Sequence, residues 1–182
     1  MRALHFVPAG SRDPKSWGCG WRDRSGINAA MSPEEAHDQE NAAVHEAGHL
    51  VVARHVFANR FWSYHHLKAR IYRVPEGTRC GSTWNGDFPF EPFDLPPEER
   101  AKIGVAGVIA ITRWRGKSVQ DLDWKNPKTM SKCDWGICDC EPGQPTRVLL
   151  TAADAVFTLL DPAADCWSDV FKEARRLIEE SR

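Results

Sequence analysis

Residues 43–53 read AVHEAGHLVVA, and this stretch decides how the rest of the chain is interpreted. Small and apolar side chains recur there at helical spacing, and no proline interrupts the chain between Pro33 and Phe57. The preceding residues, Ser32 to Glu35, supply a serine N-cap, a proline at the first helical position and a glutamate at the third. The sequence therefore predicts a long helix over residues 33–57.

Two histidines of this helix, His45 and His49, are four residues apart. Four residues correspond to about 400° of rotation, so both imidazoles project from one face, where they can bind the same zinc ion. Glu46 lies beside them, and a carboxylate in that position can take a proton from a zinc-bound water. The pattern predicts peptide-bond hydrolysis with Glu46 as general base. The alternative is an amphipathic helix whose two histidines are merely solvated or packed.

A catalytic zinc site also needs a third protein ligand and an open position for water. No histidine follows His66, and His55 is still inside the predicted helix, so we expect a carboxylate or thiolate from farther along the chain. The candidates are Cys133, Cys138, Glu98, Glu99, Asp134, Asp154 and Asp169. Asp134 has an alternative role, because an aspartate three residues after Ser131 can complete a capping box. Cys138 would share a helical face with Asp134, and its binding would close the site.

The other expected elements make an α+β, mainly helical domain. Alternation predicts a strand over residues 66–74, which residues 78–84 can pair with, and the proline-rich segment 85–97 is expected to be a loop. A helix over residues 97–115 has a face of small side chains that another helix can approach closely. A short helix is expected to begin at Ser131 and to end before residues 141–143. Residues 145–160 and a last helix around residues 167–178 are expected to form a helical hairpin.

Length and composition describe one domain preceded by an arm. The chain has 182 residues, and residues 1–30 show no sustained apolar period, so we expect a flexible, disordered arm at 1–30 and a folded domain at 31–182. The net charge of −1 argues against a nucleic-acid partner. The longest apolar stretch, residues 103–111, is too short to cross a membrane. Six cysteines are too few for a disulfide-held secreted fold, so a cytoplasmic protein with reduced thiols is expected.

Residues 43–53 resemble the active-site helix of the FtsH-type zinc peptidases, whose motif also contains the alanine and the glycine. Residues 103–110 are similar to the small-residue helix that this family packs against its active-site helix, and residues 145–180 resemble its carboxyl-terminal part. The resemblance implies a zincin-like domain. It also implies that the third ligand is an aspartate, preceded by a serine, at the start of a downstream helix, and Asp134 fits that description.

The expected function is therefore that of an ATP-independent zinc metalloendopeptidase acting on short or unfolded polypeptides, with one zinc ion held by His45, His49 and Asp134. An ATPase module is not expected, because Ile111 stands where a phosphate-binding loop ending in Gly116-Lys117-Ser118 needs a glycine. One alternative is a repressor-cleaving peptidase of the ImmA/IrrE type, which would use a glutamate as third ligand. Another is a non-enzymatic, zinc-stabilised interaction module in which Cys138 fills the fourth position.

Basic side chains are concentrated around the first predicted strand. Residues 54–79 hold six basic residues and a single acidic one. An extended peptide could add to this strand through main-chain hydrogen bonds, with Lys68 and Arg70 favouring acidic segments. The alternative is that these charges only keep an exposed sheet edge from aggregating.

Overall fold

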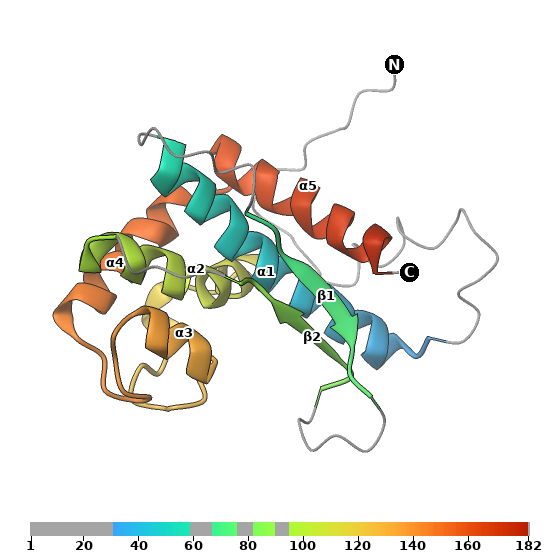
Figure 1. Cartoon of the computed structure of the whole chain (residues 1–182), viewed down its shortest axis with the longest axis horizontal. Helices are drawn as coiled ribbons and strands as arrows, with labels where there is room; N and C mark the ends of the chain where they lie inside the picture. Colours follow the sequence, from blue (N-terminus) through green and yellow to red (C-terminus); the bar gives the residue numbers. More distant parts are fainter. Residues whose placement is uncertain (1–30, 59–66, 76–81, 90–94, 182) are drawn as a thin grey trace. The chain divides into compact units, whose positions relative to one another are not determined.

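The computed structural model describes residues 31–58, 67–75, 82–89 and 95–181. The arm expected at residues 1–30 lies outside the described residues, and residues 32–182 belong to one compact unit. The described residues form five α-helices, a short 3-10 helix and a two-stranded antiparallel sheet (Figure 1). This confirms the mainly helical α+β class. None of the described helices is long and apolar enough to span a membrane.

The first helix, α1, covers Pro33–Ala58 and confirms the prediction for residues 33–57. Ser32 caps it, since its Oγ accepts a hydrogen bond from the Glu35 backbone N–H at 3.1 Å. The remaining helical elements are α2 (Pro97–Trp114), the 3-10 helix η3 (Val119–Asp121), α3 (Lys132–Ile137), α4 (Arg147–Leu159) and α5 (Asp165–Glu180). The helices predicted from the sequence are therefore all present, with ends that differ by a few residues.

Helix α1 lies between α2 and α5, and it also contacts the sheet (Figure 1). The backbones of α1 and α2 approach so closely that only a glycine fits at position 48. A Cβ atom at Gly48 would lie 2.7 Å from the Ala110 Cβ and 2.8 Å from the Ala106 carbonyl oxygen. The small-residue face predicted for residues 97–115 is thus confirmed as the surface against which α1 packs, and the α1 backbone is fixed directly on α2.

The last two helices follow each other as predicted, but the expected helical hairpin needs correction. Helix α4 packs against α2, whereas α5 packs against α1 rather than against α4. The apolar stripe of α4, including Leu149 and Val156, and that of α5, including Val170 and Leu177, are both buried. The amphipathic pattern identified the stripes correctly, but it contained no information on which helix would cover them.

The sheet pairs β1 (Arg70–Arg73) with β2 (Trp84–Asp87), in a register that places Arg70 opposite Asp87 and Arg73 opposite Trp84. The expected strand at 66–74 is confirmed only in its second half. Residues 78–81 of the expected partner at 78–84 lie outside the described residues, and the described pairing runs through residues 84–87, of which 85–87 were assigned to a loop. The first proline of that segment is Pro89, so nothing in residues 85–87 prevents pairing.

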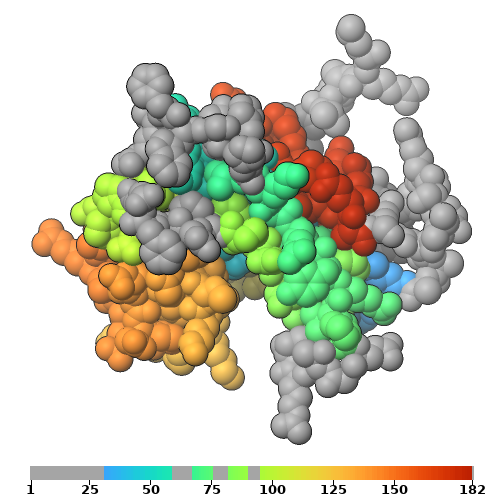
Figure 2. Space-filling model, viewed as in Figure 1, coloured from blue at the N-terminus to red at the C-terminus, as the bar shows by residue number. Residues whose placement is uncertain are grey.

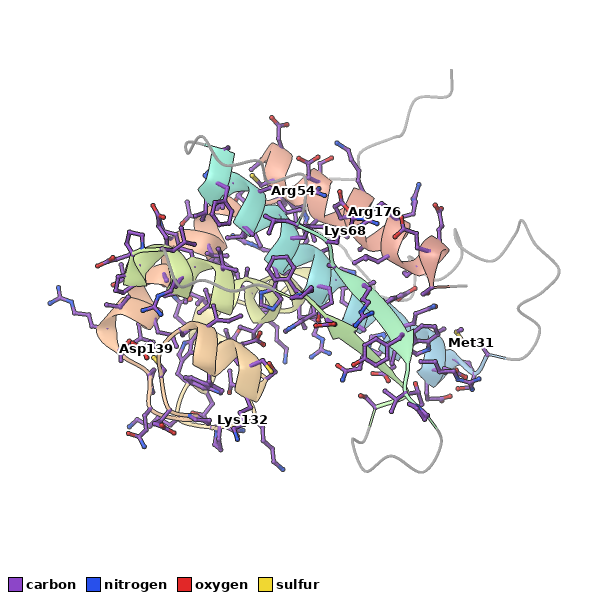
Figure 3. All side chains as sticks on the ribbon, in the orientation of Figure 1. Met31, Arg54, Lys68, Lys132, Asp139 and Arg176 are labelled. Carbon is purple, nitrogen blue, oxygen red and sulfur yellow. The ribbon has the colours of Figure 1, made fainter. Side chains whose placement is uncertain are left out.

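An ion-pair network joins α1 to α5. Glu173 accepts hydrogen bonds from Arg54 at 2.5 Å and from Arg176 at 2.7 Å, and both arginines are labelled in Figure 3. Burial raises the pKa of Glu173, but the hydrogen bonds from Arg54 and Arg176 outweigh it, so this pKa lies below its ordinary value. The folded state therefore favours the ionised carboxylate.

We expect Glu173→Gln to lower the free energy of unfolding by about 1–2 kcal/mol at pH 7, because two arginines lose a charged acceptor. Since the folded pKa is depressed, this contribution is complete above the ordinary glutamate pKa of about 4.3 and is lost as the pH falls through the lower folded value. Urea unfolding of both proteins between pH 7 and pH 3 measures it. A difference between the two proteins that stays constant over this range would contradict the assignment.

Candidate metal centre

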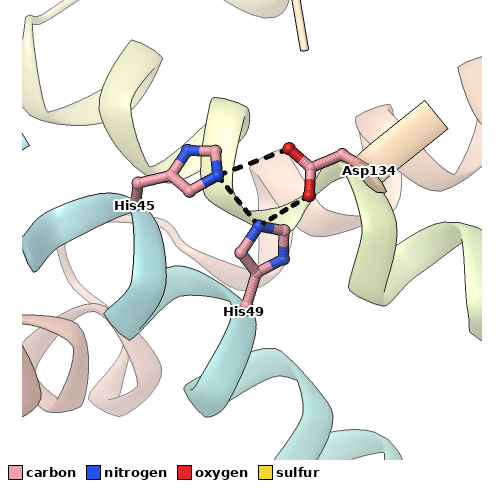
Figure 4. Close-up of side chains that lie close together, drawn as sticks. All are labelled: His45, His49 and Asp134. Atoms are coloured by element: carbon pink, nitrogen blue, oxygen red, sulfur yellow. Dashed lines mark hydrogen bonds and ion pairs between the residues drawn. The ribbon is translucent and has the colours of Figure 1, made fainter. Parts of the chain in front are cut away.

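The two histidines of α1 meet Asp134, which stands in the first turn of α3 (Figure 4). The Nε2 atoms of His45 and His49 are 3.1 Å apart. His49 Nε2 lies 3.2 Å from Asp134 Oδ1, and His45 Nε2 lies 3.4 Å from Asp134 Oδ2. Within the described ranges, these three residues are the one group of three or more His, Cys, Asp or Glu side chains whose ligand atoms come close enough to hold a metal ion.

The chemistry of this donor set fits a metal ion. Two imidazole nitrogens and one carboxylate oxygen are ordinary zinc ligands, and they leave a position open for water or substrate. The backbone carbonyl of Ile103 lies 2.7 Å from His49 Nδ1. Because a carbonyl can only accept a hydrogen bond, Nδ1 must carry a proton, so in the neutral ring it is the Nε2 lone pair that is directed at the other two residues.

Asp134 acts as a helix cap and faces the histidines at the same time. Its backbone N–H donates to Ser131 Oγ at 3.1 Å, and its Oδ2 accepts from the Ser131 backbone N–H at 3.3 Å. The two roles that the sequence left open for Asp134 are therefore compatible. The capping box fixes the side-chain rotamer, and in that rotamer both carboxylate oxygens face α1.

The short helix α3 is anchored by the residues that follow Asp134. Trp135 is completely buried, and its indole N–H donates to the Pro127 carbonyl at 3.1 Å. The helix ends in a Schellman-type turn, in which the Cys140 N–H reaches the Trp135 carbonyl and Asp139 takes a positive φ of 56°. These contacts compensate for a length of six residues, which is too short for a helix that is stable by itself.

Two glycines of α2 allow all three helices to approach the same point. A Cβ atom at Gly107 would lie 2.5 Å from His49 Nε2 and from His45 Cε1. A Cβ atom at Gly104 would lie 2.5 Å from Cys138 Sγ and 3.0 Å from the Asp134 carbonyl oxygen. Gly107 therefore makes room for the imidazoles and Gly104 for α3. The sequence identified the small-residue face, but it gave no sign that Gly107 would lie against the histidines.

The charges of His49 and Asp134 stabilise each other. Burial lowers the pKa of His49, but the charge and hydrogen bond of Asp134 outweigh it and raise this pKa to about 9. Burial likewise disfavours the ionised form of Asp134, yet the two histidines hold its pKa well below the ordinary range. Asp134 is therefore a buried anion directed at the two imidazoles. A metal cation that bound here would take the place of the His49 proton.

Glu46 lies next to this group and is in contact with β2. Its side chain is only 6% exposed, and burial is the main reason why its pKa is raised. A Cβ atom at Gly86 would collide with Cγ, Cδ and Oε1 of Glu46, so the strand backbone passes directly over this carboxyl group. Sequence reasoning missed the contact, because it placed Gly86 in a loop.

The other ligand candidates lie outside the metal-binding group. Cys138 is buried beside α2, with its Sγ 3.8 Å from the Ala101 carbonyl, and burial raises the pKa of its thiol. A buried, protonated thiol is a poor metal ligand. The remaining candidates that do not join His45 and His49 are Cys133, Glu98, Glu99, Asp154 and Asp169.

The net positive charge around β1 is smaller than the sequence of residues 54–79 suggests. Arg70 forms an ion pair with Asp87 at 2.8 Å across the sheet, and Arg73 forms one with Glu35 at 2.9 Å. Lys68 is exposed just before β1 (Figure 3). The acidic partners lie outside the segment in which the charges were counted, so the excess was overestimated. The roles of Lys68 and Arg70 in substrate binding stay predictions.

Comparisons with known proteins add no family assignment, since no protein-family model matches the chain and no curated protein is significantly similar to it. Function is therefore inferred from the geometry of the site.

Proposed function

We propose that this chain is an ATP-independent zinc metalloendopeptidase in which His45, His49 and Asp134 hold one zinc ion. The observation that carries this proposal is the convergence of these three ligand atoms within 4.8 Å of one another. Glu46, the residue next to His45 in the sequence, supplies a buried carboxyl group for proton transfer. A metal ion with three protein ligands and an adjacent carboxylate is the arrangement that metallopeptidases use.

A zinc ion in this position would polarise the substrate carbonyl and make water a stronger nucleophile. Glu46 accepts the proton of the attacking water and later returns it to the leaving amine. The raised pKa of Glu46 suits both steps, because it brings the carboxyl group closer to the pH at which it must gain and lose a proton. His49 is held in place by the Ile103 carbonyl, and Asp134 by Ser131.

The proposed substrates are short or unfolded polypeptides. The 182 residues contain no phosphate-binding loop that could couple ATP hydrolysis to unfolding, which favours substrates that reach the site already extended. Figure 2 shows the surface hollowed between the strands, in green, and the segment of α3 and α4, in orange. The elements on both sides of this hollow carry site residues, and an extended chain is narrow enough to lie between them.

No specific observation favours the two alternative functions. A repressor-cleaving peptidase would need Glu98 or Glu99 as the third ligand, but neither belongs to the group around His45 and His49. A closed, structural zinc site would need Cys138, whose thiol is buried against Ala101 instead.

Substitution of Asp134 tests the ligand set. We expect about one zinc per wild-type chain by elemental analysis, and Asp134→Asn should weaken zinc affinity by at least about 100-fold because it removes the anionic ligand. Asn keeps an acceptor oxygen for the helix cap, so the fold should persist. Ser131→Ala is the matched control, since it removes the Oγ cap at a cost of about 1 kcal/mol of stability but keeps the backbone N–H that donates to Asp134 Oδ2.

Two results would contradict this ligand set. One is full zinc content in Asp134→Asn, and the other is loss of zinc in Cys138→Ala. Asp154→Asn, a change at an exposed carboxylate of α4, should leave the zinc content unchanged.

A further inference from the structure

One side chain of α1 fixes the start of β2. The Oδ2 atom of Asp38 accepts three hydrogen bonds, from the Thr83 N–H at 2.5 Å, from the Thr83 hydroxyl at 2.9 Å and from the Trp84 N–H at 2.9 Å. Asp38 is half-buried, and the Trp84 side chain beside it is buried. A carboxylate that binds two consecutive backbone N–H groups restricts both the position and the direction of the strand.

The same strand, β2, contacts the Glu46 side chain through Gly86. Asp38 and Glu46 are eight residues apart on α1, so their side chains leave the helix within about 80° of each other. Gly86 follows Trp84 by two residues, and the Glu46 side chain packs against its Cα atom. Strand β2 is therefore hydrogen-bonded to Asp38 at its start and packs against Glu46 at Gly86. Glu46 is the general base in the proposed function.

Glu46 depends on this packing for its position. Among the described residues, no hydrogen bond holds its carboxyl group, although it is nearly buried. A glutamate side chain has several rotamers of similar energy, and the strand backbone that packs against Glu46 at Gly86 restricts which of them it can adopt. A displacement of β2 along α1 would free the carboxyl group to move away from the metal centre.

We propose that Asp38 is a positioning residue for Glu46: by fixing β2 on α1, it places Gly86 where it holds the Glu46 carboxyl group beside the metal ligands. This inference rests on the proposed peptidase function for its kinetic consequences. Asp38 itself is not one of the metal-binding residues. Its removal should therefore lower the rate of the chemical step and leave the metal ligands unchanged.

The kinetic experiment compares wild-type protein with Asp38→Ala, Asp38→Asn and Glu35→Gln, using an unfolded, fluorescently labelled polypeptide as substrate. Asp38→Ala should lower kcat by about tenfold or more, with KM and zinc content nearly unchanged, because small misplacements of a reacting group are costly. Asp38→Asn keeps an acceptor oxygen and should restore kcat to within about threefold of wild type. Glu35→Gln is the matched control. Glu35 is also an acidic residue of α1, but its ion pair is with the Arg73 side chain of β1 and not with the backbone of β2.

A double-mutant cycle separates positioning from a general loss of structure. If Asp38 acts through Glu46, adding Asp38→Ala to Glu46→Gln should not lower the residual activity further. An equal loss of kcat in both backgrounds would overturn the proposal, and so would an unchanged kcat in Asp38→Ala alone.

A spectroscopic measurement keeps this inference distinct from the peptidase assignment. The ¹³C resonance of the Glu46 carboxyl group should shift in Asp38→Ala and should stay in place in Glu35→Gln. If the wild-type protein hydrolyses no peptide, the peptidase function fails, and this resonance still decides whether Asp38 positions Glu46. An unchanged resonance in Asp38→Ala would overturn the proposal.

Discussion

Replacing Gly107 with alanine is expected to weaken metal binding strongly while leaving α2 helical. The added Cβ would lie 2.5 Å from His49 Nε2 and from His45 Cε1, far inside van der Waals contact. A retreat of α1 as a whole would give up the close packing of the two helix backbones at Gly48, so we expect the imidazoles to move instead of the helix. Rotation of the two rings would separate their Nε2 atoms. We expect zinc affinity to fall by at least about 100-fold, which competition with a chromophoric chelator can measure.

Gly107→Ala should not destabilise helix α2 itself. Alanine favours a helix interior over glycine by about 1 kcal/mol, so any loss of zinc binding comes from the clash and not from helix propensity. Gly136→Ala in α3 is the matched control, because in the described part of the chain no atom outside the local helix backbone lies within 4 Å of its added Cβ. It should keep wild-type zinc affinity. Wild-type affinity in Gly107→Ala would show that the metal does not bind between these two histidines.

Glu46→Gln is expected to remove catalysis and to keep the metal. Glutamine has nearly the same shape as glutamate, but its amide cannot accept the proton of the attacking water. General-base catalysis contributes roughly 10²- to 10⁴-fold, so kcat should fall by that amount while the zinc content stays at the wild-type value. Because burial already disfavours the charged carboxylate, the neutral side chain should not reduce the free energy of unfolding.

Glu40 provides the control for this variant. It is also a glutamate of α1 whose pKa burial raises, but the charge that acts on it is that of His37, whereas Glu46 interacts with His45, His49 and Asp134. Glu40→Gln should therefore retain wild-type kcat. Retention of kcat in Glu46→Gln would show that another group is the general base. An equal loss in both variants would show that the effect comes from a change in α1 rather than from proton transfer.

The features predicted correctly from sequence are those that depend on neighbouring residues. His45 and His49 share a face because four residues make about one helical turn, and the structure places their Nε2 atoms 3.1 Å apart. The pairing of Ser131 with Asp134 in a capping box is equally local and was also correct. In each case the geometry follows from the backbone of one helix, so its sequence pattern was sufficient.

The features predicted incorrectly depend on distant partners. The apolar stripes of α4 and α5 were recognised, but they are covered by α2 and α1 rather than by each other. Arg70 was counted as a free positive charge, and its partner Asp87 lies seventeen residues away on the paired strand. Strand pairing and helix packing join segments whose separation in sequence carries no fixed geometric relation.

The third member of the metal-binding group illustrates the same division. The residue pattern predicted two histidines on one helical face with a glutamate beside them and left seven possible third ligands, among which the family resemblance pointed to Asp134. The tertiary structure brings Asp134, and none of the other six, to the two histidines. Gly104 and Gly107 let α3 and α1 approach α2 closely enough for Asp134 to face both imidazoles, whereas Cys138 is turned into the core. Helical periodicity fixes positions within one segment, but the distance between segments is decided by the side chains that pack between them.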